Sequence, residues 1–228
     1  MDVLECIKTR RSIRLYQKRD VPNHLIGLIL DAATRAPSAG NLQPWEFIVV
    51  RDPERKEMLW RASLKQDHVK HAPVVIVVCA NVKKVAARYG KRGERLYAIQ
   101  DTAAAIQNMM LAAHAIGLGT CWVGAFDEEE VKVACSIPEH IRPVALITVG
   151  YPAEKSSEPP RVPFENLTWI DFYENSKEPW EFGLKSLDAY VRELQLSIER
   201  KFDEFSKKKK KSSFLDELKK KFSPSKKK

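Results

Sequence analysis

The chain has 228 residues, of which 44% are hydrophobic and 30% are charged, and this is the composition of a globular protein rather than a disordered one. The formal net charge is +9, but residues 176–228 hold 16 basic and 9 acidic residues, so the rest of the chain is nearly neutral. The charge therefore does not indicate a nucleic-acid-binding body. No apolar run approaches the ~20 residues that a membrane-spanning helix needs.

The first notable feature is a basic segment at residues 10–14, which follows a short helix predicted for residues 2–9. If this segment is extended, Arg10, Ser12 and Arg14 point the same way, because side chains alternate along a strand. Two guanidinium groups and a hydroxyl that face one spot suit a phosphate group. The alternative is a solvated basic patch.

The second feature is a polar loop at residues 37–45. The apolar pattern predicts a helix that opens at Pro22 and ends before Pro37, and a strand follows at residues 46–50. Between them, Ser38, Asn41 and Gln43 could direct polar groups at a flat ligand with a polar edge. An ordinary helix-to-strand connection is the alternative.

The middle of the chain predicts a buried strand and a buried helix. A helix begins at Asp52, and the β-branched run at residues 74–80 predicts a strand that is buried on both faces. Residues 81–96 are basic, irregular or helical, and could form a mobile cover over a site. Residues 97–116 predict an alanine-rich helix that other elements surround.

A strand is next predicted at residues 120–124, and it ends in a glycine. Gly124 has no side chain to keep a ligand away from the backbone, although an ordinary turn explains this glycine equally well. A capping box at Asp127 predicts the start of a short helix, and residues 143–150 form another apolar strand.

The C-terminal part differs in character from the rest. Three prolines make residues 158–163 extended, and the aromatic residues at 164–183 suggest a segment that lies on another surface. We expect a first domain at residues 1–183, an amphipathic helix at 184–206, and a partly disordered Lys-rich tail at 207–228.

Several kinds of catalytic machinery are missing from the sequence. The four cysteines are scattered, and the N-terminus lacks a signal pattern, which predicts a reduced, cytoplasmic protein. The histidines form no metal-ligand cluster, so we expect no metal site. There is no G-x-G-x-x-G loop, Walker loop or G-x-S-x-G elbow. The protein therefore either binds without chemistry or depends on a cofactor.

Four pieces of the chain together resemble the FMN-dependent nitroreductase family, the NAD(P)H nitroreductase-like flavoproteins. These pieces are residues 10–14, 37–45, 101–124 and 160–161, and they follow the family's order within a likeness that spans about residues 3–173. The resemblance implies an α+β fold with a central mixed β-sheet flanked by helices. It also implies an intertwined homodimer with FMN at the subunit interface.

The resemblance further implies a set of cofactor-binding residues. The FMN phosphate would be held by Arg10, Ser12, Arg14 and Arg161, with Arg11 nearby. The ribityl chain and ring would be lined, from the neighbouring subunit, by Pro37, Ser38, Ala39, Asn41 and Gln43. The backbone N–H groups of Val123 and Gly124 would lie near flavin N5 and O4.

The implied function is that of an NAD(P)H-dependent FMN oxidoreductase. A hydride would pass from NAD(P)H through flavin N5 to a small-molecule acceptor such as a nitroaromatic or a quinone. The alternative is a flavin-fold binding protein whose basic amphipathic tail targets an anionic membrane or nucleic acid. The sequence leaves open the acceptor and the choice between NADH and NADPH.

Overall fold

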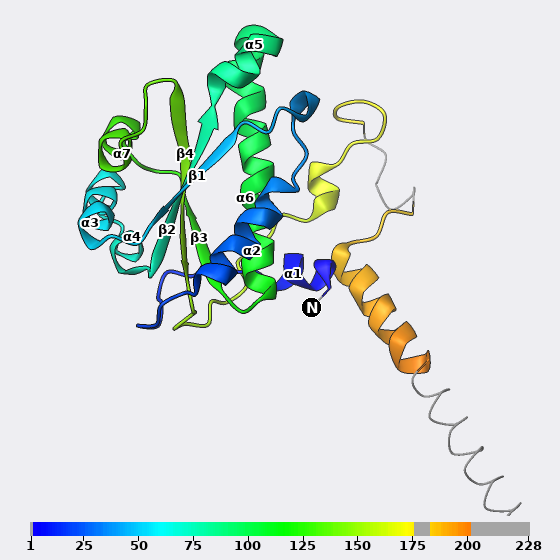
Figure 1. Ribbon diagram of the computed structural model, residues 1–228. Helices are drawn as coiled ribbons and strands as arrows, with labels where there is room; N and C mark the ends of the chain where they lie inside the picture. The colour runs from blue at the N-terminus through cyan, green and yellow to red at the C-terminus, as the bar shows by residue number, and fades with distance from the viewer. Residues whose placement is uncertain (1, 176–182, 202–228) are drawn as a thin grey trace, which may run out of the picture. The chain divides into compact units, whose positions relative to one another are not determined.

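The computed structural model describes residues 2–175 and 183–201 (Figure 1). The chain divides into two compact units, Met1–Pro159 and Pro160–Lys228, which are described separately. This division falls earlier than the boundary at residue 183 that the sequence predicted. The sheet and the helices that flank it belong to the first unit.

The core of the first unit is a four-stranded β-sheet with the strand order β1-β2-β4-β3. The strands are β1 (Trp45–Val50), β2 (Val74–Asn81), β3 (Gly119–Val123) and β4 (Ile141–Gly150). All three neighbouring pairs are antiparallel. Among the described residues, parallel pairing is limited to an isolated bridge between Ser12 and Thr120. β1 and β3 are thus opposite edges of the sheet, separated by about 14 Å at ordinary strand spacing.

Helices cover both faces of the sheet, as the buried strand requires. Val74, Ile76 and Val78 pack toward α2 (Asn23–Thr34) and α6 (Ala98–Ala115). The alternate side chains of β2 pack on the other face, against three helices: α3 (Pro53–Ala62), α4 (Asp67–His71) and α7 (Glu128–Cys135). The two helical layers lie on either side of the sheet in Figure 1. The α+β fold predicted from the sequence is confirmed. The sheet was expected to be mixed, but its four described strands all pair antiparallel.

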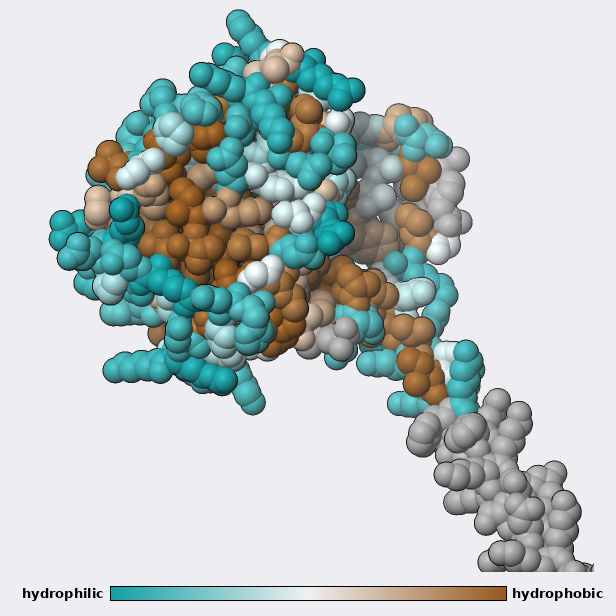
Figure 2. Space-filling view, in the orientation of Figure 1, coloured by the Kyte–Doolittle hydropathy of each residue, from teal (hydrophilic) through white to brown (hydrophobic). Residues whose placement is uncertain are grey.

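The remaining elements of the first unit are shorter or connect larger ones. They include α1 (Val3–Thr9), a 3₁₀ turn at Ala39–Asn41, and α5 (Val82–Arg92). A π-helical turn at Gly93–Tyr97 joins α5 to α6, so the long helix begins one residue later than predicted. Hydrophilic side chains surround the end of the unit where α5 lies (Figure 2).

The second unit contains a 3₁₀ turn at Phe164–Leu167 and a helix over residues 187–201. This helix lies inside the range 184–206 predicted from the sequence, and the end of that range lies outside the described residues. The Lys-rich tail at 207–228 also lies outside them. None of the described helices combines the length and apolarity needed to span a membrane.

Close packing at Gly119 attaches the N-terminal segment to the sheet. A Cβ atom at Gly119 would lie 2.8 Å from both Cβ and Cγ1 of Ile13. The backbone N–H of Ile13 donates to the Thr120 carbonyl at 2.9 Å. Gly119 therefore allows the basic segment to lie along β3. At Gly124, by contrast, an added Cβ would meet only Trp122, no closer than 3.7 Å.

This difference predicts unequal effects of the same substitution. Gly119→Ala should lower the free energy of unfolding by about 1–3 kcal/mol, because the new methyl group overpacks against the branched Ile13. Gly124→Ala should change it by less than about 0.5 kcal/mol. Urea denaturation of the two variants measures both values, and an equal loss of stability would contradict the packing argument.

Candidate functional site

The basic segment forms the first part of the candidate site, along the β3 edge of the sheet. Its backbone is held on one side by the Ser12–Thr120 bridge. On the other side, the N–H groups of Arg14 and Leu15 donate to one carboxylate oxygen of Glu154, at 2.6 and 3.1 Å. Backbone contacts therefore hold the segment in place, and its side chains are not needed to hold it.

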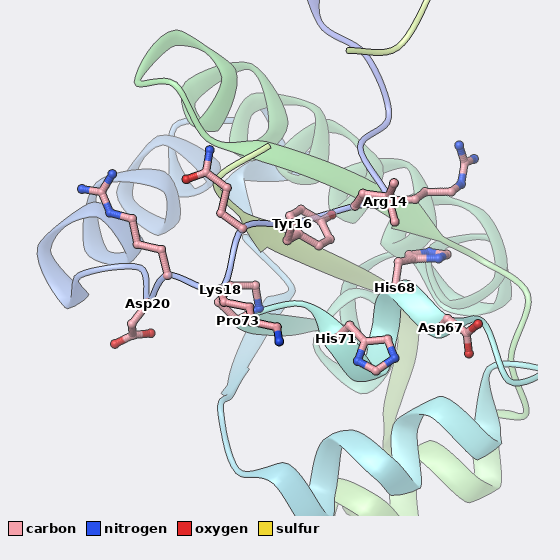
Figure 3. Close-up of a pocket in the computed structure, with 11 residues that line it drawn as sticks. Arg14, Tyr16, Lys18, Asp20, Asp67, His68, His71 and Pro73 are labelled. Atoms are coloured by element: carbon pink, nitrogen blue, oxygen red, sulfur yellow. The ribbon is translucent and has the colours of Figure 1, made fainter. Parts of the chain in front are cut away.

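The arginines of this segment line two different cavities. Arg10 lines a cavity of about 360 Å³ together with His114 and Lys155. Arg14 lines another, of about 500 Å³, together with His68 (Figure 3). Regular strand alternation predicted one common direction for Arg10 and Arg14. The structure does not bring them to one spot, because the pairing with β3 is an isolated bridge rather than a continuous ladder.

Arg11, which was expected near the phosphate, lines the smaller cavity together with Arg10, whereas Arg161 cannot be placed relative to either cavity. Arg11 Nη1 donates to the carbonyls of Lys8 at 2.6 Å and Arg10 at 3.0 Å, and Nη2 pairs with Glu158 at 3.2 Å. Its guanidinium therefore holds the chain in place. Arg161 belongs to the second unit, so its phosphate role stays a prediction.

The polar loop at residues 37–43 forms the second part of the site, and its backbone is unusual. Gly40, Asn41 and Gln43 have φ angles of 57°, 56° and 49°, in the left-handed region. Two of them carry side chains, and such residues persist only where their surroundings hold them; they concentrate at functional sites. The Gln43 N–H donates to Ser38 Oγ at 3.0 Å, and Gln43 Nε2 donates to Asn41 Oδ1 at 3.1 Å.

A buried carboxylate on α6 forms a hydrogen bond with the backbone of this loop. Asp101 is 6% exposed, and its Oδ1 accepts a hydrogen bond from the Ala39 N–H at 2.9 Å. Its Oδ2 is buried with no hydrogen-bond partner in the described part of the chain. Burial raises the pKa of this carboxyl group, and the hydrogen bond from Ala39 opposes the rise. The sequence reasoning missed Asp101, although an acid in the first turn of an otherwise apolar helix is a signal.

The end of β3 supplies the third part of the site. Val123 is buried, whereas Gly124 is exposed and has open space around it. Gln66 Nε2 donates to the Ala125 carbonyl at 3.3 Å, which ties the turn before α4 to this strand end. Neither packing nor a left-handed backbone requires a glycine at position 124. The open backbone there remains available to a ligand.

His68 is a second residue that sequence reasoning missed, because it was considered only as a metal ligand. Its side chain is 7% exposed, and Nε2 is buried without a hydrogen-bond partner among the described residues. Burial lowers the pKa of the imidazole, and the positive charge of Arg14 lowers it further. Figure 3 shows Arg14 and His68 together at one end of the larger cavity.

Arg14, unlike His68, is exposed, and its guanidinium has no hydrogen-bond acceptor within the described ranges. One cavity wall thus presents a guanidinium and an imidazole nitrogen that have no hydrogen-bond partner within these ranges. Within residues 2–175 and 183–201, no three His, Cys, Asp or Glu side chains are grouped so as to hold a metal ion.

The sheet topology separates the predicted site residues into two sets. The loop at 37–43 leads directly into β1, whereas Arg14, Val123 and Gly124 lie at the β3 edge. Two strands stand between these edges. A single copy of the first unit therefore does not bring the loop together with the other residues.

Comparison with known proteins shows to which family the chain is similar. The model of the nitroreductase family matches residues 7–66 and 61–151. A protein of Methanothermobacter thermautotrophicus, whose name joins NADH dehydrogenase and NAD(P)H nitroreductase, is 46% identical over 160 residues, which cover 68% of this chain and 79% of that protein. A Thermus thermophilus protein named NADH dehydrogenase is 38% identical over 194 residues, covering 73% of this chain and 95% of its own.

The solved structures agree with the sequence relatives. The structure of B. megaterium NfrA1 has a TM-score of 0.70 and 31% identity, and the match covers 75% of each chain. The family model matches more than half of this chain, in the region that carries the sheet and the candidate site. The chain belongs to the nitroreductase family.

Proposed function

We propose that this protein is an NAD(P)H-dependent FMN oxidoreductase and that it acts as a homodimer with FMN between the subunits. The chemistry that FMN supplies is two-electron (hydride) transfer from NAD(P)H through flavin N5 to an oxidised acceptor such as a nitroaromatic or a quinone. The cofactor and the donor are supported by a Bacillus subtilis relative, 28% identical over 191 residues, that is named FMN reductase [NAD(P)H].

The observation that carries the proposal is the separation of the site residues between the two edges of the sheet. The family resemblance assigns both sets to one cofactor. A second copy of the chain can bring its own loop at 37–43 to the β3 edge of the first. Two symmetric sites then form per dimer, and neither is complete in one subunit.

The residues at the β3 edge fit a flavin. His68 Nε2 is buried without a partner among the described residues and Arg14 is exposed beside it, so both would present polar groups to the oxygen- and nitrogen-bearing edge of the ring. Arg14 carries a permanent positive charge, which stabilises negative charge on a reduced ring. Gly124 leaves the backbone open, so that a flat ring could approach it closely.

We assign the two arginines to different parts of the cofactor, because they line different cavities. Arg10, with His114 and Lys155 beside it, suits the phosphate end of the cofactor, while Arg14 suits the ring. Asp101 would act as a positioning residue, because it holds the loop through the Ala39 N–H. A cytoplasmic location stays the prediction made from the cysteines.

The proposal predicts a yellow protein. The purified chain should show the absorbance of oxidised flavin, NAD(P)H should bleach it anaerobically, and an added quinone or nitroaromatic should restore the colour. A colourless protein that cannot be reconstituted with FMN would sink the assignment.

The shared site predicts complementation between variants at the two edges. Arg14→Ala and Asn41→Ala should each weaken FMN binding as homodimers, because each lesion then affects both sites. A heterodimer of one Arg14→Ala and one Asn41→Ala subunit should regain one intact site out of two. Differently tagged subunits and the FMN content of the purified heterodimer measure this. If both edges served the same chain, the heterodimer would have no intact site.

His68 predicts a dependence of stability on pH. Its pKa is lowered on folding, so the unfolded chain binds more protons as the pH falls below the ordinary histidine value of about 6.5. Acidification through that window should therefore destabilise the folded state, despite a small opposing effect of Asp67.

His68→Gln should flatten this part of the profile, and the matched variant of the exposed His24, His24→Gln, should not. Urea denaturation at about pH 7.5 and about pH 5.5, on protein freed of flavin, measures the difference. An unchanged slope in His68→Gln would contradict a buried, neutral imidazole.

A further inference from the structure

The segment from α5 into the π-helical turn carries an unusual concentration of positive charge. Residues 82–95 hold six basic side chains against one acid, Glu94, and all six are exposed. The α5 cation cluster consists of Lys83, Lys84, Arg88, Lys91, Arg92 and Arg95. Residues 1–175 as a whole are nearly neutral. The cluster is therefore a local excess of positive charge, and acidic residues elsewhere in the chain balance it.

The α5 cation cluster is also not compensated by neighbouring carboxylates. Within the part of the chain that the structure describes, none of its six side chains forms an ion pair. Elsewhere in the first unit such pairs are common, as with Lys132 and Glu129 at 2.7 Å or Arg142 and Glu128 at 2.7 Å. Uncompensated like charges repel one another and attract anions.

The cluster lies directly on the loop that forms one wall of the proposed cofactor site. Lys84 Nζ donates to the Gln43 carbonyl at 3.3 Å, and Arg88 Nη1 donates to the Gly40 carbonyl at 3.3 Å. Tyr89 and Arg88 pack so closely on Gly40 that an added Cβ would lie 2.8 Å from Arg88 Nη1 and nearer still to the Tyr89 hydroxyl. The positive charge is therefore placed beside the site.

The fold builds this position specifically. Val85 is fully buried, and a Cβ on Gly93 would lie 2.7 Å from its carbonyl oxygen, so the chain folds back tightly on α5. Gly90 has a φ of 57°, which ends the regular helix. Tyr89 and Tyr97 meet edge to face with ring centroids 5.3 Å apart. An ordinary solvated helix face needs none of these contacts.

We infer that the α5 cation cluster binds the phosphate groups of the nucleotide hydride donor and gives NADPH an advantage over NADH. The inference rests on the proposed function. NADH carries two phosphate charges in its pyrophosphate, and NADPH adds a 2′-phosphate. An attraction that depends on charge therefore acts more strongly on NADPH.

The test compares three donors that deliver the same hydride with different numbers of phosphates: NADPH, NADH and 1-benzyl-1,4-dihydronicotinamide, which has none. The variant Lys83→Gln/Lys91→Gln/Arg95→Gln removes three charges whose side chains make no hydrogen bond to the loop. The control variant Arg61→Gln/Lys65→Gln/Lys70→Gln removes three exposed charges from α3, α4 and the turn between them, on the other face of the sheet.

Anaerobic stopped-flow bleaching of the FMN-loaded full chain gives the second-order rate constant for each donor at low salt. In the α5 variant we expect a loss of about tenfold with NADPH, about threefold with NADH, and no change with the benzyl compound. The control variant should match the wild type. Added salt should reduce the NADPH advantage of the wild type. Titration calorimetry with NADP⁺ and NAD⁺ should show the same order of binding losses without turnover.

Two results would overturn the inference while leaving the proposed function intact. Equal losses with all three donors would mean that the cluster only supports the loop. Unchanged rates with all three would mean that it is a solvated surface. If none of the donors bleached the FMN-loaded wild type, the proposed function itself would fail, and the inference with it.

Discussion

The architecture depends on one constraint, the burial of strand β2 on both faces. Its residues from Val74 to Ala80 are almost completely inaccessible to water, so a helical layer must cover each face. Flanking this strand with β1 and β4 leaves β1 and β3 as the edges. The proposed chemistry depends on that outcome, because in the proposed dimer the loop before β1 and the segment along β3 would supply two separate halves of the binding site.

Elements with a strong local pattern were predictable, and tertiary relations were not. The run at β2 and the alanine-rich α6 follow from hydrophobic patterning within a few residues. Asp101 could not be assigned a role, because its partner Ala39 is 62 positions away in the chain. The divergence of Arg10 and Arg14 was missed for a different reason: alternation holds only where a continuous ladder enforces it, and here there is a single bridge.

The protein uses its charged groups in two ways. Arg11, Lys132 and Arg142 are paired with carboxylates and contribute to local structure. Arg14 and the α5 cation cluster have no such partners in the described residues, and both lie next to the elements that we assign to ligand binding.

The contact between Ile13 and Gly119 has a consequence for solubility. β3 is an edge strand, and an uncovered edge offers free N–H and C=O groups to any other extended chain. The bridge at Ser12 and the hydrogen bond from Ile13 to Thr120 occupy part of that edge from within the same molecule. The segment that presents the arginines therefore also blocks part of the β3 edge from pairing with another strand. The same few residues thus contribute both to ligand binding and to resistance against aggregation.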